Sequence, residues 1–204
     1  MRNNVTCPVF AIISLLVLIA YGQGQQELNS FTDSRDSKEY RTVVIGKQTW
    51  LAENLNYEMS GSKCYNDSTV YCDKYGRLYD WETAMKACPS GWHLPSDVEW
   101  EDLAAEVGGE KTAGKYLKSV DGWLSYKGKP GNGEDTYGFM ALSGGLGRSD
   151  GYFGDIGVLG YWWSASEYNV NSAYGGGMYF DDDGVGGGSY RKGENLFSVR
   201  CLLN

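Results

Sequence analysis

The sequence predicts an α+β domain, and three features indicate this class. The 204 residues include 29 Gly and 16 Tyr but only 4 Pro, which indicates many turns and short strands rich in aromatic side chains. Two segments between residues 80 and 109 carry the start and stop signals of helices. From residue 122 onward helical periodicity is lost, and short apolar segments alternate with glycine-rich turns. Helices in one part of the chain, with strands before and after them, are typical of an α+β fold.

The first 22 residues have the composition of a secretory signal peptide. Arg2 is the only charge before an apolar run over residues 9–20, and the small residues Ala20 and Gly22 lie at its exit. This run is shorter than the roughly 20 residues that a membrane span needs, so we expect cleavage, with an uncleaved anchor as the alternative. No later apolar run in the sequence is long enough to span a membrane, and we expect no transmembrane segment after cleavage.

Residues 23–39 are polar and aperiodic, which predicts a flexible leader. The folded domain is therefore expected to cover residues 40–204. It begins with β-branched residues over 40–45, a turn at Gly46 and a second extended stretch over 48–52. This pattern predicts a β-hairpin.

Two main helices are expected after the hairpin, and each has its own boundary signals. Asp80 is a suitable N-cap for the segment WETAMKA, and Pro89 lies just beyond its end. The second helix follows Ser96, which can form a capping box with Glu99, and Gly108 ends it.

The rest of the chain is expected to be mostly strand and loop. A short third helix is expected over residues 112–119. Beyond residue 122, the segments YGFMAL, GYWWSASEY, GGMYF and LFSVRCLL predict short strands joined by long glycine-rich loops.

Four cysteines follow the expected signal peptide, and an even number in an exported protein favours disulfide bonds. Four cysteines allow three pairings. Cys64 and Cys72 bracket a short segment that contains a turn, so a local bridge between them is the simplest choice. That choice leaves Cys88 to pair with Cys201. A zinc site is excluded by the spacing, because no Cys-x2-Cys pair is present and the chain has a single histidine.

Several motifs occur in a fixed order along the chain. They are YRTVVIGKQTWLAENLNY, KYGRLYDWETAMKACPSGWHLPSDVEWEDLAAEVGG, YGFMALSGG, GYWWSASEY and a terminal SVRCL. In these motifs the chain resembles the Fibrobacter succinogenes major paralogous domain over residues 40–203. The segment GWHLPSDVEW, with the later WWS segment and the closing VR strand, is also similar to the wider C-type-lectin-like and sulfatase-modifying-factor folds.

This resemblance implies a C-type-lectin-like domain of the α+β class, with two main helices against short antiparallel strands and long glycine-rich loops. It implies that the first and last strands pair, and that the cysteine after the first helix, Cys88, bonds to Cys201 on the closing strand. The loops between Trp123 and Asn195 would then form an exposed binding face. The family itself implies no particular ligand, because one fold hosts many functions.

The net charge and the family resemblance together limit the classes of function and partner that we expect. With 18 basic and 26 acidic residues the chain repels phosphate backbones, so we expect no nucleic-acid partner. We expect an exported recognition module without catalysis, secreted or on the bacterial outer surface, with a glycan or another cell-surface ligand as its partner. The alternatives are a structural surface component or an enzyme of the sulfatase-modifying-factor type. The oxidase branch of that fold needs paired thiols, and Cys201, assigned to a disulfide, stands alone in the C-terminal part.

Aromatic side chains are the main candidates for ligand contact, because planar rings stack on the apolar faces of sugars. The candidates are Tyr152, Trp162, Tyr168 and Tyr174, which lie in or near glycine-rich segments. Neighbours on a strand point to opposite faces, so at least one of Trp162 and Trp163 is expected in the core.

Carboxylates supply the second candidate group. Asp181, Asp182 and Asp183 precede Gly184, and clustered carboxylate oxygens are the ligands that calcium prefers. The segment does not fit the EF-hand pattern. A solvated acidic turn is the simpler interpretation, and a lectin-type calcium site that also uses Glu167 or Asn169 is the alternative; no other cofactor is expected. The single histidine, His93, is interpreted as structural.

Overall fold

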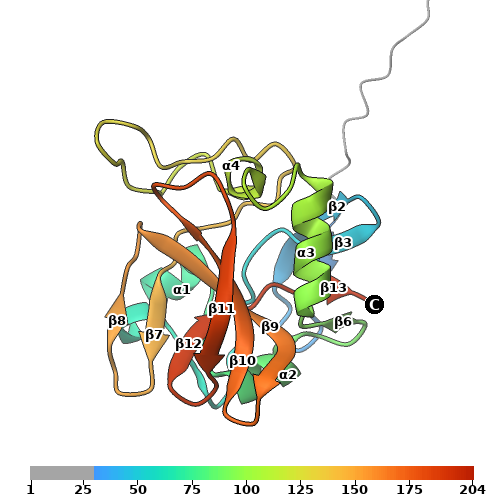
Figure 1. Cartoon of the computed structure of the whole chain (residues 1–204). Coiled ribbons are helices and arrows are strands. Elements are labelled where there is room, and N and C mark those ends of the chain that lie inside the picture. The colour runs from blue at the N-terminus through green and yellow to red at the C-terminus, as the bar shows by residue number, and fades with distance from the viewer. Residues whose placement is uncertain (1–29) are drawn as a thin grey trace, which may run out of the picture.

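The structure is a computed structural model that describes residues 30–204 (Figure 1), and the signal peptide expected over residues 1–22 lies outside this range. The helices are α1 (Thr69–Tyr75), α2 (Trp81–Ala87), α3 (Asp97–Glu106) and α4 (Ala113–Leu117), with a 3-10 turn η1 at Tyr65–Asp67. The first six strands are β1 (Ser30–Thr32), β2 (Glu39–Ile45), β3 (Gln48–Leu51), β4 (Ser62–Lys63), β5 (Leu78–Tyr79) and β6 (Trp92–His93). The others are β7 (Leu146–Arg148), β8 (Phe153–Gly154), β9 (Leu159–Asn169), β10 (Ser172–Tyr179), β11 (Gly186–Arg191), β12 (Asn195–Ser198) and β13 (Leu202–Leu203).

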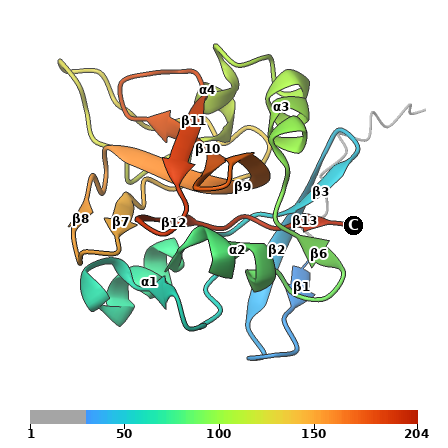
Figure 2. The same ribbon diagram turned by 60° about the horizontal axis from the view of Figure 1, so that its bottom comes forward.

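The strands form two curled, mainly antiparallel sheets. One sheet has the order β1-β2-β3-β13-β6, and the other runs β11-β10-β9-β12-β5-β4, with β7 pairing to β12 and β8 to β7. In Figure 2, α3 and α4 lie on one side of β9 and β12, and α1 and α2 lie on the other. Few helices and many antiparallel strands confirm the α+β class. Among residues 30–204, no helix is both long and apolar enough to cross a lipid bilayer.

The elements with strong local signals are confirmed. The predicted hairpin is β2–β3, in which Ile45 pairs with Gln48 around the turn. The Asp80 side chain caps α2 by accepting a hydrogen bond from the backbone of Thr83. Ser96 begins α3 with the expected capping box, and α4 is the short third helix. Local hydrogen-bonding chemistry therefore fixes these boundaries.

The flexible leader predicted over residues 23–39 is wrong from β1 onward, because β1 pairs with β2 as an edge strand. Phe31 packs against Trp92, with ring centroids 5.2 Å apart. Asp33 is fully buried and accepts hydrogen bonds from the Arg35 guanidinium, which neutralises its charge. One aromatic ring and one ion pair order a segment whose average composition is polar.

The turn expected between Cys64 and Cys72 is the 3-10 turn η1, and the helix α1 follows it. Two further predictions are corrected. Beyond residue 122, β9 has 11 residues and β10 has 8, so these strands are long, and the glycine tracts at 175–177 and 186–188 pair with each other as strands. These segments form strands because they pair with segments elsewhere in the chain, and a glycine-rich composition alone does not reveal such pairing. The last strand, β13, pairs with β3 and β6 and not with the first strand.

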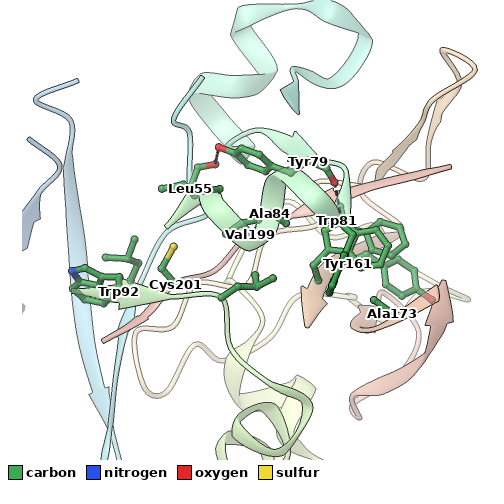
Figure 3. Packing of buried hydrophobic residues seen from close by; sticks show 14 of the residues in the cluster. Leu55, Tyr79, Trp81, Ala84, Trp92, Tyr161, Ala173, Val199 and Cys201 are labelled. Carbon is green, nitrogen blue, oxygen red and sulfur yellow. Dashed lines mark hydrogen bonds between the residues drawn. The ribbon is translucent and has the colours of Figure 1, made fainter. Parts of the chain in front are cut away.

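The core lies on both faces of β9. Trp163 joins one apolar cluster with Tyr79 and Phe197, and Trp162 joins the other with Trp50, so both tryptophans of the pair are buried, with 0% and 1% of their surface exposed. Figure 3 shows part of the first cluster, in which residues from α2, β9, β10 and the closing segment pack together. The alternation of side chains along β9 thus places one indole in each half of the core.

Both predicted disulfides are confirmed. Cys64 bonds to Cys72 across η1 and α1, and Cys88 bonds to Cys201, 113 residues later. The second bond joins the end of α2 to the closing segment of the chain.

Candidate functional site

A groove of about 250 Å³ lies between helix α3 and the β10–β11 ribbon. We call it the α3 groove. Three aromatic side chains line it together with carboxylates and a glycine-rich stretch of strand. A largely apolar hollow with a few polar groups is the usual form of a small-ligand site.

The glycines of β10 and β11 form one wall of the groove. Gly176 pairs with Gly187 across the two strands, and both line the hollow. A Cβ atom at Gly176 would meet no atom closer than the Gly186 oxygen at 3.6 Å, and its backbone lies in an ordinary strand. By contrast, a Cβ at Gly177 would lie 2.8 Å from the Tyr161 ring. Internal packing therefore favours glycine at 177, whereas no contact inside the domain requires glycine at 176.

Two tryptophans line the groove. Trp162 donates a hydrogen bond from Nε1 to Asn54 Oδ1 (2.8 Å), and its ring is 6.4 Å from that of Trp100. The prediction of Trp162 as an exposed stacking ring is therefore wrong, because the residue is buried and contributes to the lining from within the core. Trp100 packs on Trp50 with centroids 4.8 Å apart, and its Nε1 has no partner in the described part of the chain. Sequence analysis missed Trp100, since a tryptophan in a helical apolar stripe indicates only core packing.

Tyr174 on β10 lines the groove and is half-buried. Its ring meets that of Tyr168 edge to face, with centroids 5.5 Å apart, and Tyr168 is 57% exposed. The structure thus brings together these two predicted tyrosines. Tyr152 is 52% exposed but lies in the turn between β7 and β8, away from the groove lining.

Helix α3 is held against the sheet at its first turn. The Asp97 N–H donates to Ser166 Oγ on β9 (3.0 Å), and the Ala165 N–H donates to the Pro95 oxygen (2.8 Å). These contacts fix the groove wall that carries Asp97 and Glu101, one helical turn apart. Burial raises the pKa of the Asp97 carboxyl.

Comparison with known proteins identifies the domain. The family model described as the Fibrobacter succinogenes major domain matches residues 43–202. The chain belongs to this family. No curated protein and no solved structure matches the chain. In this Fibrobacter succinogenes major domain, the matched region extends from β2 to β13 and includes the α3 groove.

The aspartate turn of this family member lies at the other end of the β10–β11 ribbon from Tyr174. At about 3.3 Å per residue, the strand from Tyr174 to Asp181 spans roughly 20 Å. The two candidate groups, the tyrosines Tyr168 and Tyr174 and the aspartates of this turn, therefore lie at separate ends of the ribbon. Within residues 30–204 no group of three or more His, Cys, Asp or Glu side chains is arranged to hold a metal ion.

A buried lysine already supplies a positive charge at this turn. Lys118 Nζ donates to the backbone oxygens of Tyr179 (3.0 Å) and Asp182 (2.8 Å). Desolvation lowers the pKa of Lys118, and the nearby carboxylates, with Asp183 the strongest, act in the opposite direction. Asp182 Oδ1 accepts from the Gly184 N–H, which closes a local turn. Asp181–Asp183 thus form a turn held by an ammonium group.

His93, which the sequence analysis interpreted as structural, contacts the start of α3 and the last residue of the sequence. Its ring nitrogens lie 2.7 Å from Asn204 Oδ1 and 3.0 Å from Glu99 Oε1. Burial alone would raise the pKa of Glu99, but hydrogen bonds from Ser96 and the contact with His93 hold it below its usual range. These contacts fasten the start of α3 to the end of the chain.

Proposed function

We propose that this domain is a non-catalytic recognition module with a C-type-lectin-like fold, exported to the cell surface or the medium, and that it binds carbohydrate in the α3 groove. The observation that carries this proposal is the open position at Gly176, where the strand could bear a side chain and does not. A hollow beside aromatic rings suits a sugar ring, which stacks on such rings through its C–H faces.

Two features support the fold and the export. The disulfide between Cys88 and Cys201 joins the end of the first main helix to the closing segment, as the resemblance implied. Disulfides form in oxidising compartments, so two of them favour an exported protein. The disulfide also occupies Cys201, which favours recognition over the thiol-based oxidase alternative.

Affinity measurements with the purified protein test the proposal. We expect a β-linked oligosaccharide to bind with a Kd in the roughly millimolar to micromolar range that is usual for single-site sugar recognition, about −4 to −8 kcal/mol. The substitution Gly176→Val places a side chain in the groove without forcing a left-handed backbone, so it should abolish binding. Because valine suits a strand and glycine does not, the melting temperature should not fall.

A matched control is Gly193→Val, which adds the same side chain in a turn where a Cβ would meet nothing within 4 Å. This variant should bind as the wild type does. Binding that survives in a folded Gly176→Val variant would move the site elsewhere, and an absence of binding to any oligosaccharide would refute the proposal.

A further inference from the structure

The lining of the α3 groove carries acidic groups without basic ones. Asp97, Glu101 and Glu110 line the hollow, and no Lys, Arg or His residue does so. None of the ion pairs found within residues 30–204 includes any of these three residues. An occupant with a positive charge would therefore meet carboxylates that have no competing partner.

The start of α3 offers little to an anion. Helix N-termini attract anions through free N–H groups, but here the N–H of Asp97 is taken by Ser166 Oγ and that of Glu99 by Ser96 Oγ. The carboxylates in this first turn add negative charge at the same place. An acidic sugar would meet repulsion here with few donors to offset it.

The aromatic lining favours the same sign of charge. Trp100 and Tyr174 line the hollow and are only partly buried, and the faces of such rings attract cations within about 6 Å. The molecule already holds one ammonium group by this combination outside the groove. Lys192 Nζ lies 4.2 Å from the centroid of the Trp81 ring and 2.9 Å from Glu167 Oε1.

From this lining we infer that the α3 groove selects ligands that carry a cationic amino group, so that an amino sugar binds more tightly than its neutral or acidic counterpart. The inference rests on the proposed function and names the ligand class of the same site. The carboxylates of Asp97 and Glu101 receive the ammonium group, and the aromatic rings contact the sugar.

Three β-1,4-linked oligosaccharides of equal length test this selection by titration calorimetry at pH 6. They are an oligomer of glucosamine, its N-acetylated form and the corresponding oligomer of glucose, which differ at one ring position. We expect the glucosamine oligomer to bind roughly tenfold more tightly than the two neutral sugars. The preference should shrink as salt is raised from about 0.05 to about 0.5 M, because ions screen exposed charges.

Two double variants on the same helix supply the matched comparison. Asp97→Asn with Glu101→Gln should remove the preference while leaving the neutral sugars bound. Asp102→Asn with Glu106→Gln removes the same charge at the same spacing from exposed residues outside the lining, and it should keep the preference.

The outcomes separate this inference from the proposed function. Equal affinity for all three sugars would overturn the inference and leave sugar recognition in place. A preference that survives the Asp97 and Glu101 changes would also overturn it. If no sugar binds but the diamine cadaverine does, with the same dependence on these two residues, cation selection stands and carbohydrate recognition fails. Binding of none of these probes would overturn both.

Discussion

Arg200 joins three parts of the domain that are distant in sequence. Its buried guanidinium donates to the backbone oxygens of Leu51 (3.1 Å) and Phe139 (2.7 Å) and to Asn54 Oδ1 (2.8 Å). Asn54 Oδ1 in turn accepts from Trp162 Nε1, at the bottom of the α3 groove. Burial lowers the pKa of Arg200 to about 9, so the group stays charged at neutral pH. One side chain thus connects the closing segment to the candidate site.

Replacing Arg200 with leucine should therefore destabilise the protein by about 3 kcal/mol, because two buried oxygens and the Asn54 amide lose their donor. Urea denaturation followed by tryptophan fluorescence measures this. The comparison is Arg191→Leu, an exposed arginine, whose effect should stay within about 0.5 kcal/mol. A loss below about 1 kcal/mol for the Arg200 variant would show that the buried oxygens find other donors.

At the scale of single elements, the turn between β10 and β11 depends on Lys118. The chain reverses at Asp181–Asp183. The ammonium group of Lys118 binds two carbonyl oxygens on the inner side of this turn, and its Nζ lies 5.3 Å from the centroid of the Trp123 ring. The far end of the ribbon that forms one wall of the groove is therefore held by this buried ammonium group, together with backbone hydrogen bonds such as that from Lys115 N–H to the Asp183 oxygen (2.8 Å).

The substitution Lys118→Met keeps the apolar stem and removes the ammonium group, so we expect the turn to open and overall stability to fall by about 2 kcal/mol. Hydrogen exchange should become faster over residues 179–185 and remain unchanged in α2. Calcium or EDTA should leave the melting temperature of the wild type unchanged, because the lysine already provides the positive charge. A calcium-dependent rise in melting temperature would contradict this description of the turn.

The elements differ in how well the sequence predicts them. The two main helices follow from Asp80 and from the Ser96–Glu99 capping box, because a cap acts within four residues. The edge strand β1 and the long β9–β10 pair depend on partners elsewhere in the chain. Local composition therefore predicted a flexible leader and loops in places where the structure has strands.

The residues of the candidate site also differ in how well the sequence predicts them. Tyr168 and Tyr174 were predicted as candidates because they lie in or near glycine-rich segments, and their rings do contact each other. Tyr174 lines the groove, and Tyr168 lies beside it. Asp97, Trp100 and Glu101 were not predicted, since on a helix they resemble an ordinary surface and core stripe. Their role depends on α3 packing beside a glycine-rich ribbon that follows about 80 residues later in the sequence.

For the whole molecule, the two disulfides should contribute unequally. On the chain-entropy model, the bond between Cys88 and Cys201, with a sequence separation of 113, contributes about 4–5 kcal/mol. The bond between Cys64 and Cys72, with a separation of 8, contributes about 2–3 kcal/mol.

Alanine replacement of each pair, followed by chemical denaturation, should therefore show the larger loss for the long loop. The two variants are matched, because each removes one bridge and two sulfur atoms. The opposite order of stability would mean that the folded state around α1 depends on its bridge more than chain entropy implies.

Residues 196–203 have a consequence for when this domain can fold. β12 is inserted between β9 and β5, and Leu202 pairs with both Trp50 and His93. Neither sheet is complete until these residues are present, so a nascent chain that stops short of them has open sheet edges and an unfilled core. We therefore expect the domain to close only after its last two strands are available, which is compatible with the export proposed above.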